Sequence, residues 1–298
     1  MAALSTVVVG FDGTDQGHDA LVLAQALTGP GARLVVCCVH PPDPPLLEPV
    51  DRELSTEAEA HLRLRAARAA LGDDPRAAYV TRQAFSAAGG LHEEAAAQEA
   101  DLLVVGSSHR GALGRVLAGS VTRQALQAAP CAVAVAPRGL HDAPPAPPRL
   151  IGVAFDGGPE ARAALRTAAA LARELGAELR LLAVADLATS GFGWAVGAPL
   201  HALREAEQAN LRRGLDAAIA GLEGVTASAE VLEGRASDRL VAASAALDLL
   251  VLGSRNYGPV RRALLGTVSG RVADEAACPV LVVPRAGDDD TAPPPVSS

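Results

Sequence analysis

The sequence ADLLVVGSSHRGALGRVLAGSVT, residues 100–122, is matched later in the chain by LDLLVLGSRNYGPVRRALLGTVS, residues 247–269. Each stretch starts with a short apolar run, continues through a loop rich in glycine, and reaches a Gly-Ser or Gly-Thr pair before a helical pattern. A short apolar run that ends in turn residues is typical of a buried strand, and Gly, Ser or Thr often precede a helix. The two stretches therefore predict one strand–loop–helix unit that occurs twice.

The repeat extends along almost the whole chain. Asp12 in STVVVGFDGTDQGHDAL matches Asp156 in LIGVAFDGGPEARAAL, 144 positions later, and Cys131 matches Cys278, 147 positions later. A drift of only three positions indicates two copies of one domain rather than a solenoid of short repeats. We expect a first domain at 1–138, a linker at 139–149, a second domain at 150–285 and a disordered tail at 286–298.

The linker sequence GLHDAPPAPP, residues 139–148, is expected to be stiff and extended, without a helix or a central strand, because it is rich in proline.

Strand and helix patterns alternate in both copies. Expected strands in the first copy are 6–10, 33–39, 77–83, 102–105 and 132–136, and expected helices are 16–27, 56–71, 90–98 and 120–129. Expected strands in the second copy are 151–155, 178–184, 229–232, 249–252 and 280–283, and expected helices are 161–175, 203–220, 237–247 and 268–276. Such alternation predicts right-handed βαβ crossovers. The fold class is therefore α/β: two tandem doubly wound domains, each a five-stranded parallel sheet with helices on both faces.

Composition excludes several classes of function. The chain has 298 residues and a net charge of -8, and all 26 basic residues are arginine. The acidic balance argues against nucleic acid or an anionic membrane as a partner. Without lysine, the chain cannot build a P-loop, a protein kinase site or a Schiff-base site. The scattered histidines predict no metal site, and no nucleophile elbow or triad is present, so we expect no catalytic residues.

The four cysteines form no C-x-x-C pair and are expected to be buried and reduced. The first residues, MAALSTVVVGFDG, do not resemble a signal peptide, and no apolar run approaches the roughly 18 residues of a membrane span. We therefore expect a soluble, cytoplasmic protein.

The candidate ligand site lies where the first and fourth strands of each copy end. In an open α/β sheet, ligands bind beyond the carboxyl ends of the strands, where the winding direction reverses. The loop after Gly106 and the pair Gly119-Ser120 have the same spacing as Gly253 and Gly266-Thr267. Glycine amides and a helix start capped by Ser or Thr can hold a phosphate without lysine. The alternative is that these glycines only form turns and the hydroxyl residues only cap helices.

On these residues the chain resembles a tandem universal stress protein, with both halves covered nearly end to end. The family pattern is G-x2-G-x9-G-(S/T), and members that bind ATP use it to hold the phosphates. The resemblance implies that the adenosine part contacts an Asp after the first strand and a Val at the end of the second. Carried over to this sequence, the full set of candidate nucleotide-binding residues is Asp12, Val39, Gly106, Ser108, His109, Gly119, Ser120 and Val121, then Asp156, Val184, Gly253, Arg255, Asn256, Gly266, Thr267 and Val268.

The sequence departs from the family pattern at the second glycine, which is His109 in one half and Asn256 in the other. Asn and, less readily, His can adopt the left-handed backbone of a glycine, but a side chain there crowds the outer phosphates. The expected cofactor is therefore ATP, ADP or AMP, with Mg²⁺ accompanying ATP, and the milder Asn256 favours the second half. Arg255 or His109 could donate to phosphate or could simply be solvated.

Two further functions stay open at this point. The sites could be degenerate and empty, leaving a structural or interaction protein. An adenylyl-transfer enzyme would need charged groups beside the loops that the sequence does not offer. The resemblance also implies domain pairing through the last strands, so Val133–Val135 and Val280–Val283 are expected to pair within one chain as a pseudo-dimer; a homodimer also remains open.

Overall fold

The computed structural model describes residues 4–43, 55–72, 74–107, 116, 119–186, 200–254 and 266–284. The first half contains β1 (Thr6–Gly10), α1 (Asp15–Leu27), β2 (Arg33–His40), α2 (Thr56–Leu71), β3 (Ala77–Gln83), α3 (Ala87–Ala97), β4 (Leu102–Gly106), α4 (Ser120–Leu126) and β5 (Ala132–Ala136). The second half contains β6 (Leu150–Ala154), α5 (Pro159–Leu175), β7 (Glu178–Ala185), α6 (Leu200–Ala220), β8 (Ala227–Glu233), α7 (Ala236–Ser244), β9 (Leu249–Gly253), α8 (Thr267–Glu275) and β10 (Val280–Val283).

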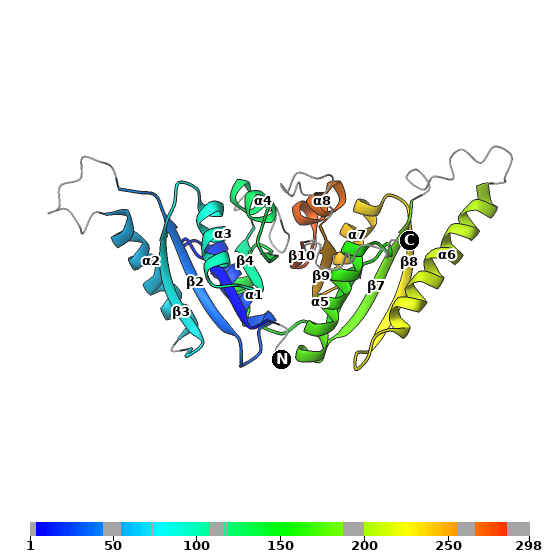
Figure 1. Ribbon diagram of the computed structural model, residues 1–298, viewed down its shortest axis with the longest axis horizontal. Helices are drawn as coiled ribbons and strands as arrows, with labels where there is room; N and C mark the ends of the chain where they lie inside the picture. The colour runs from blue at the N-terminus through cyan, green and yellow to red at the C-terminus, as the bar shows by residue number, and fades with distance from the viewer. Residues whose placement is uncertain are drawn as a thin grey trace, which may run out of the picture.

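The strands form one ten-stranded sheet in the order β3-β2-β1-β4-β5-β10-β9-β6-β7-β8 (Figure 1). Neighbouring strands are parallel within each half, and only β5 and β10 are antiparallel. The predicted α/β class with two doubly wound domains is therefore confirmed. The two five-stranded sets are, in addition, joined edge to edge.

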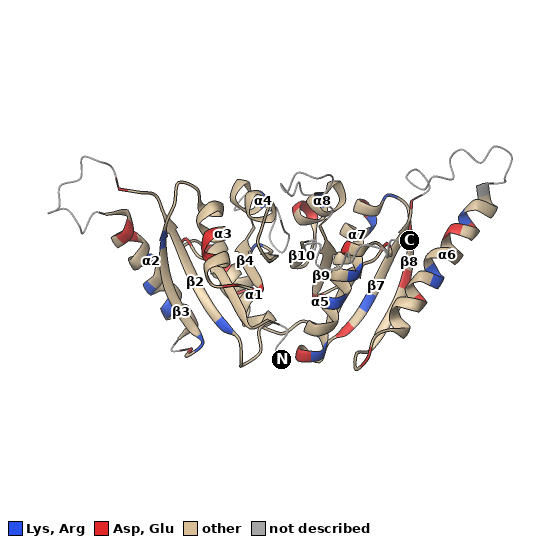
Figure 2. Cartoon of the chain, viewed as in Figure 1, with Lys and Arg blue, Asp and Glu red and all other residues tan. Residues whose placement is uncertain are grey.

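Helices cover both faces of this sheet because its central strands carry apolar side chains on both sides. Val7 and Val9 pack in one buried cluster with leucines of α1, α2, α5 and α6. Val8 packs in a second cluster with residues of α3, α4, α7 and α8. Continuous apolar runs such as TVVVG are expected where a parallel strand is buried on both faces. Acidic and basic residues are interspersed along the outer helices α2 and α6 (Figure 2).

The two halves meet at the predicted strand pair. In β5 and β10, Val135 lies opposite Val280 and Val133 lies opposite Val282, which confirms the expected pairing of the last strands within the chain. An ion pair between Arg123 of α4 and Asp274 of α8, with an N–O distance of 2.9 Å, links the halves above this junction. The pairing covers two strand edges that would otherwise be open to association.

The linker differs from the extended form expected of it. Leu140–Asp142 form a short 3-10 helix, η2, which begins after Gly139 with a φ of 81°. This turn is held by Asp19 of α1, whose carboxylate is fully buried and accepts hydrogen bonds from Gly139 N (3.0 Å) and His141 N (2.8 Å). The proline-rich composition predicted stiffness but gave no sign of a distant carboxylate that could fold the start of the linker.

Element boundaries shift by a few residues at several ends. The strands 6–10, 77–83, 132–136 and 280–283 were predicted with their observed bounds. The helix expected at 120–129 ends at Leu126, and Ala128 has a φ of 55°, which no helix accommodates. The helix expected at 237–247 ends at Ser244. Within the described residues, no helix has the length and apolar character that crossing a membrane requires.

All four cysteine thiols are free and buried, as predicted. Burial raises the pKa of Cys37, Cys131 and Cys278 to about 12. At pH 8 only about one thiol in ten thousand is then a thiolate, the form that reacts with alkylating reagents. We expect mass spectrometry to find almost no carbamidomethylation of these three residues after brief iodoacetamide treatment of the folded protein, and full modification in guanidinium chloride. Rapid modification of the folded protein would show that the strands open readily.

Candidate functional site

The candidate site lies at the point where the sheet changes winding direction. In the first half the chain runs outward from β1 through β2 to β3, then returns to β4 on the other side of β1 and continues to β5. β1 and β4 are hydrogen-bonded neighbours, and β6 and β9 are the corresponding pair in the second half. The carboxyl ends of such a pair leave a crevice between diverging loops, the usual ligand position in this architecture.

Asp12 and Asp156 shape the loops that follow β1 and β6. Asp12 Oδ1 accepts hydrogen bonds from Thr14 N (3.0 Å) and Thr14 Oγ1 (2.5 Å), and Asp156 Oδ1 accepts one from Gly158 N (2.9 Å). The residue after each aspartate is a glycine: Gly13 has a φ of 80° and Gly157 a φ of 79°, in the left-handed region that favours glycine. Both Asp12 and Asp156 are exposed, directly after the carboxyl ends of β1 and β6.

Gly106 and Gly253, at the ends of β4 and β9, are required by close packing. A Cβ atom on Gly106 would lie 2.7 Å from the carbonyl carbon of Gln16, in the first turn of α1. A Cβ on Gly253 would lie 2.6 Å from the backbone oxygen of Glu160, in the first turn of α5. The first helix of each half, α1 or α5, therefore packs directly against the end of the fourth strand, β4 or β9. This contact places the loop that contains Asp12 or Asp156 beside the glycine at the end of that strand.

The helices that follow the fourth strands begin one residue earlier than a cap at Ser120 or Thr267 would require. Gly119 and Gly266 are the N-cap residues of α4 and α8, and neither cap provides a side-chain hydrogen bond. Ser120 and Thr267 are instead the first helical residues, and both are exposed. The expectation that these hydroxyls cap the helices was wrong; by contrast, the side chains of Thr14, Ser55 and Ser86 cap α1, α2 and α3.

Uncapped helix starts of this kind present backbone N–H groups that an anion can accept. Apolar side chains adjoin them: Val121 is 42% exposed, and Val268 is half-buried.

Val39 and Val184 lie near the carboxyl ends of β2 and β7, where they are half-buried. A Cβ on Gly90 of α3 would lie 2.7 Å from Val39 Cγ1, so this valine packs closely on α3. The remaining predicted site residues, Ser108, His109, Arg255 and Asn256, lie outside the described residues.

Sequence reasoning missed two buried hydroxyls at the same place in both halves. Ser107 and Ser254 directly follow β4 and β9 and are each 4% exposed. Their Oγ atoms have no hydrogen-bond partner among the residues that the structure describes. The signal was present as a Gly-Ser pair repeated at 106–107 and 253–254. Nothing in the pattern distinguished these serines from ordinary turn residues.

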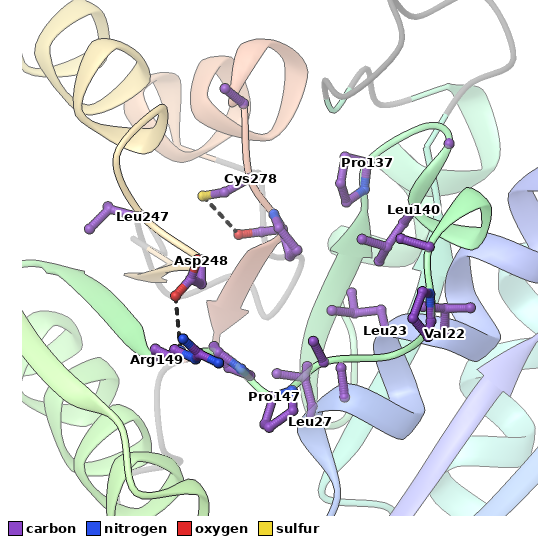
Figure 3. Close-up of a pocket in the computed structure, with 18 of the residues that line it drawn as sticks. Val22, Leu23, Leu27, Pro137, Leu140, Pro147, Arg149, Leu247, Asp248 and Cys278 are labelled. Carbon is purple, nitrogen blue, oxygen red and sulfur yellow. Dashed lines mark hydrogen bonds between the residues drawn. The ribbon is translucent and has the colours of Figure 1, made fainter.

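A cavity of about 580 Å³ lies between the two halves and contains none of the predicted site residues (Figure 3). Leu23 and Leu27 of α1, Pro147 of the linker and Cys278 line it, together with Asp248, whose carboxylate accepts hydrogen bonds from Arg149 N and Leu150 N. This mainly apolar lining does not suit a phosphate. Among the described residues, no group of three or more His, Cys, Asp or Glu side chains is arranged to hold a metal ion.

Comparisons with known proteins agree on one family. The sequence model of the universal stress protein family matches residues 4–137 and, a second time, residues 148–284. A universal stress protein of Mycobacterium tuberculosis is 30% identical over 297 residues, which cover 94% of this chain and 99% of that protein. A second universal stress protein of this organism is 34% identical over 190 residues, a match that spans only 62% of its length and 62% of this chain.

The same fold occurs in a crystal structure. A universal stress protein from Archaeoglobus fulgidus superposes with a TM-score of 0.69 at 16% sequence identity, covering 94% of this chain and 98% of that one. Both halves and their junction are therefore included in the structural match.

Proposed function

Because the chain belongs to the universal stress protein family and carries the family domain twice, we propose that it acts in the stress response by binding an adenine nucleotide at the strand-end crevice of each half. The observation that carries this proposal is the pair of helix starts at Gly119 and Gly266, which offer amides without a side-chain cap beside the crevice. Backbone donors and the helix dipole favour a phosphate there, and no lysine is needed.

The remaining candidate residues suit the nucleoside. Asp12 and Asp156 place exposed carboxylates at the rim, where they can accept hydrogen bonds from ribose hydroxyls or the base. Val39, Val121 and their counterparts Val184 and Val268 add partly exposed apolar surface for the rest of the ligand. Because the sequence offers no catalytic set, the proposed role is regulatory binding in the reducing cytoplasm, where free buried cysteines are usual.

Titration calorimetry and thermal denaturation with ATP, ADP and AMP, each with and without Mg²⁺, test this proposal. A ligand at one hundred times its dissociation constant stabilises the fold by about 2.7 kcal/mol, so a clear rise in melting temperature is expected. The double variant Gly119→Val, Gly266→Val should lose this response. Both caps have extended backbones that valine tolerates. We expect the branched side chain, next to the first turn, to hinder the approach of a phosphate to its amides.

The matched control is Gly31→Val, at an exposed position where a Cβ meets no atom within 4 Å; this variant should bind as the parent does. Binding that survives in the double variant would remove the helix starts from the site. If no adenine nucleotide shifts the melting temperature at millimolar concentration, the crevices are empty and the chain is better described as an interaction protein.

A further inference from the structure

The cavity of about 580 Å³ at the junction of the two halves has no part in the proposed nucleotide site. Leu23 and Leu27 of α1 form one wall. Leu247 and Cys278, in the turns that precede β9 and β10, lie on the opposite side of the cavity (Figure 3). Mainly apolar cavities of a few hundred cubic ångströms, at a boundary between domains, are common binding sites for small molecules.

The linker forms a third wall. Asp19 fixes its start, because the carboxylate accepts hydrogen bonds from Gly139 N (3.0 Å) and His141 N (2.8 Å), and Gly139 itself lines the cavity. Pro144 and Pro147 continue this wall in a stretch that forms neither helix nor strand. Proline restricts the backbone, so the stretch resists collapse onto α1. The cavity is therefore present before any ligand binds.

The charged residues of the lining favour an anion. Arg138 and Arg149 line the cavity together with one acidic residue, Asp248. The Asp248 carboxylate is already engaged, because its Oδ2 accepts hydrogen bonds from Arg149 N and Leu150 N, each at 2.9 Å. Arg149 is exposed, and its guanidinium forms no ion pair with another described residue. A ligand with one anionic group thus meets more positive than negative charge here.

We propose that this cavity binds a small aliphatic carboxylate, with its hydrocarbon chain between α1 and the linker prolines and its carboxylate towards Arg149. Apolar walls offer water no hydrogen bonds, so a hydrocarbon chain that enters loses its hydration and gains packing contacts. The N–H groups of a guanidinium can donate in pairs to a carboxylate. Both halves and the linker contribute walls, so one domain alone does not contain this site.

Titration calorimetry with octanoate and with octanol tests the proposal, because the two molecules share a chain and differ in charge. We expect octanoate to bind saturably, one molecule per chain, with the negative change in heat capacity that marks burial of apolar surface. Arg149→Gln should weaken octanoate binding about two- to fivefold, the range of an exposed ion pair, and leave octanol binding unchanged.

Val22→Trp tests the cavity itself. Val22 lies on α1, lines the cavity and is half-buried, so a larger side chain there takes up space that the ligand needs. Both ligands should bind about tenfold more weakly or worse, since exclusion of only two methylene groups already corresponds to such a loss. Val241→Trp is the matched control, because Val241 is a half-buried valine of α7 that does not line the cavity.

The titrations of the parent and of Val22→Trp decide whether the cavity is a site, with circular dichroism to check that each variant is folded. If the parent does not bind octanoate saturably, or if folded Val22→Trp binds it as the parent does, the proposal is overturned. If Arg149→Gln binds octanoate as tightly as the parent, the carboxylate does not meet Arg149 and the proposed ligand class is wrong. Should Val22→Trp not fold, the octanoate and octanol titrations of Arg149→Gln decide.

Discussion

Replacing Gly253 by alanine should lower the free energy of unfolding by about 3 kcal/mol, the upper end for an overpacked site. The added Cβ would lie 2.6 Å from both the carbonyl carbon and the carbonyl oxygen of Glu160, and these backbone atoms cannot rotate away as a side chain can. Gly106→Ala should cost a similar amount, because its Cβ would lie 2.7 Å from the carbonyl carbon of Gln16. Chemical denaturation followed by circular dichroism measures both effects.

Gly31→Ala provides the control, since a Cβ there meets no atom within 4 Å and the change should stay within about 0.5 kcal/mol. A Gly253→Ala variant as stable as this control would mean that the first turn of α5 does not rest on the end of β9. The contact that places the loop of Asp156 beside the end of β9 would then be absent.

Replacing Asp19 by alanine should destabilise the protein by about 3 kcal/mol, as breaking a buried charged pair does. Asp19 is fully buried in α1 and accepts hydrogen bonds from two linker amides and from the ring of His141, with an Oδ1–Nδ1 distance of 2.7 Å. Without the carboxylate, those donors lose their partner, and the start of the linker keeps only its apolar packing of Leu140 on the first half. Asp142→Asn is the control, because Asp142 is exposed and lies 3.8 Å from His141 Nε2.

The pH dependence of stability should identify His141 as the titrating partner. Its hydrogen bond with Asp19, together with the nearby charges of Asp142 and Asp15, raises the pKa of His141 above its ordinary value of 6.5. The imidazole of His18 also faces it, with ring centroids 6.2 Å apart. A raised pKa in the folded state means that the stabilisation is complete below about pH 6.5 and is lost as pH rises through the folded pKa.

Denaturation of the parent and of His141→Gln from pH 5.5 to 9 measures this effect. The parent should be the more stable of the two at low pH, and the difference should shrink towards pH 9, where a neutral hydrogen bond remains. If the difference in stability does not change with pH, protonation of His141 does not contribute to the free energy of unfolding.

Much of the fold could be predicted from the sequence, because its signals are local. Continuous apolar runs predicted the central strands, and residues 6–10 and 132–136 were assigned with their observed bounds. The repeat predicted two domains, and the family resemblance predicted their pairing through β5 and β10. Helix ends were less predictable. The helix expected at 120–129 ends at Leu126, and two residues later Ala128 has a positive φ that a helix cannot contain.

The candidate site was predicted in outline but not in its contacts. The spacing of the glycines located the loops, yet Gly106 and Gly253 prove to be required by helices that approach from elsewhere in the chain. Ser120 and Thr267 were expected to cap helices in which they are the first helical residues. Ser107 and Ser254 were not predicted, because their burial and their lack of a hydrogen-bond partner among the described residues depend on the folded environment.

The order of strands and helices, the duplication and the location of the loops at strand ends are properties of the sequence by itself, because side-chain periodicity and backbone sterics act over a few neighbouring residues. Only the tertiary structure decides that Asp19 folds the start of a linker 120 positions away, and that a glycine is needed where α5 meets β9. Those contacts join residues distant in the chain, and their energies arise from close packing and exclusion of water, which no local pattern specifies.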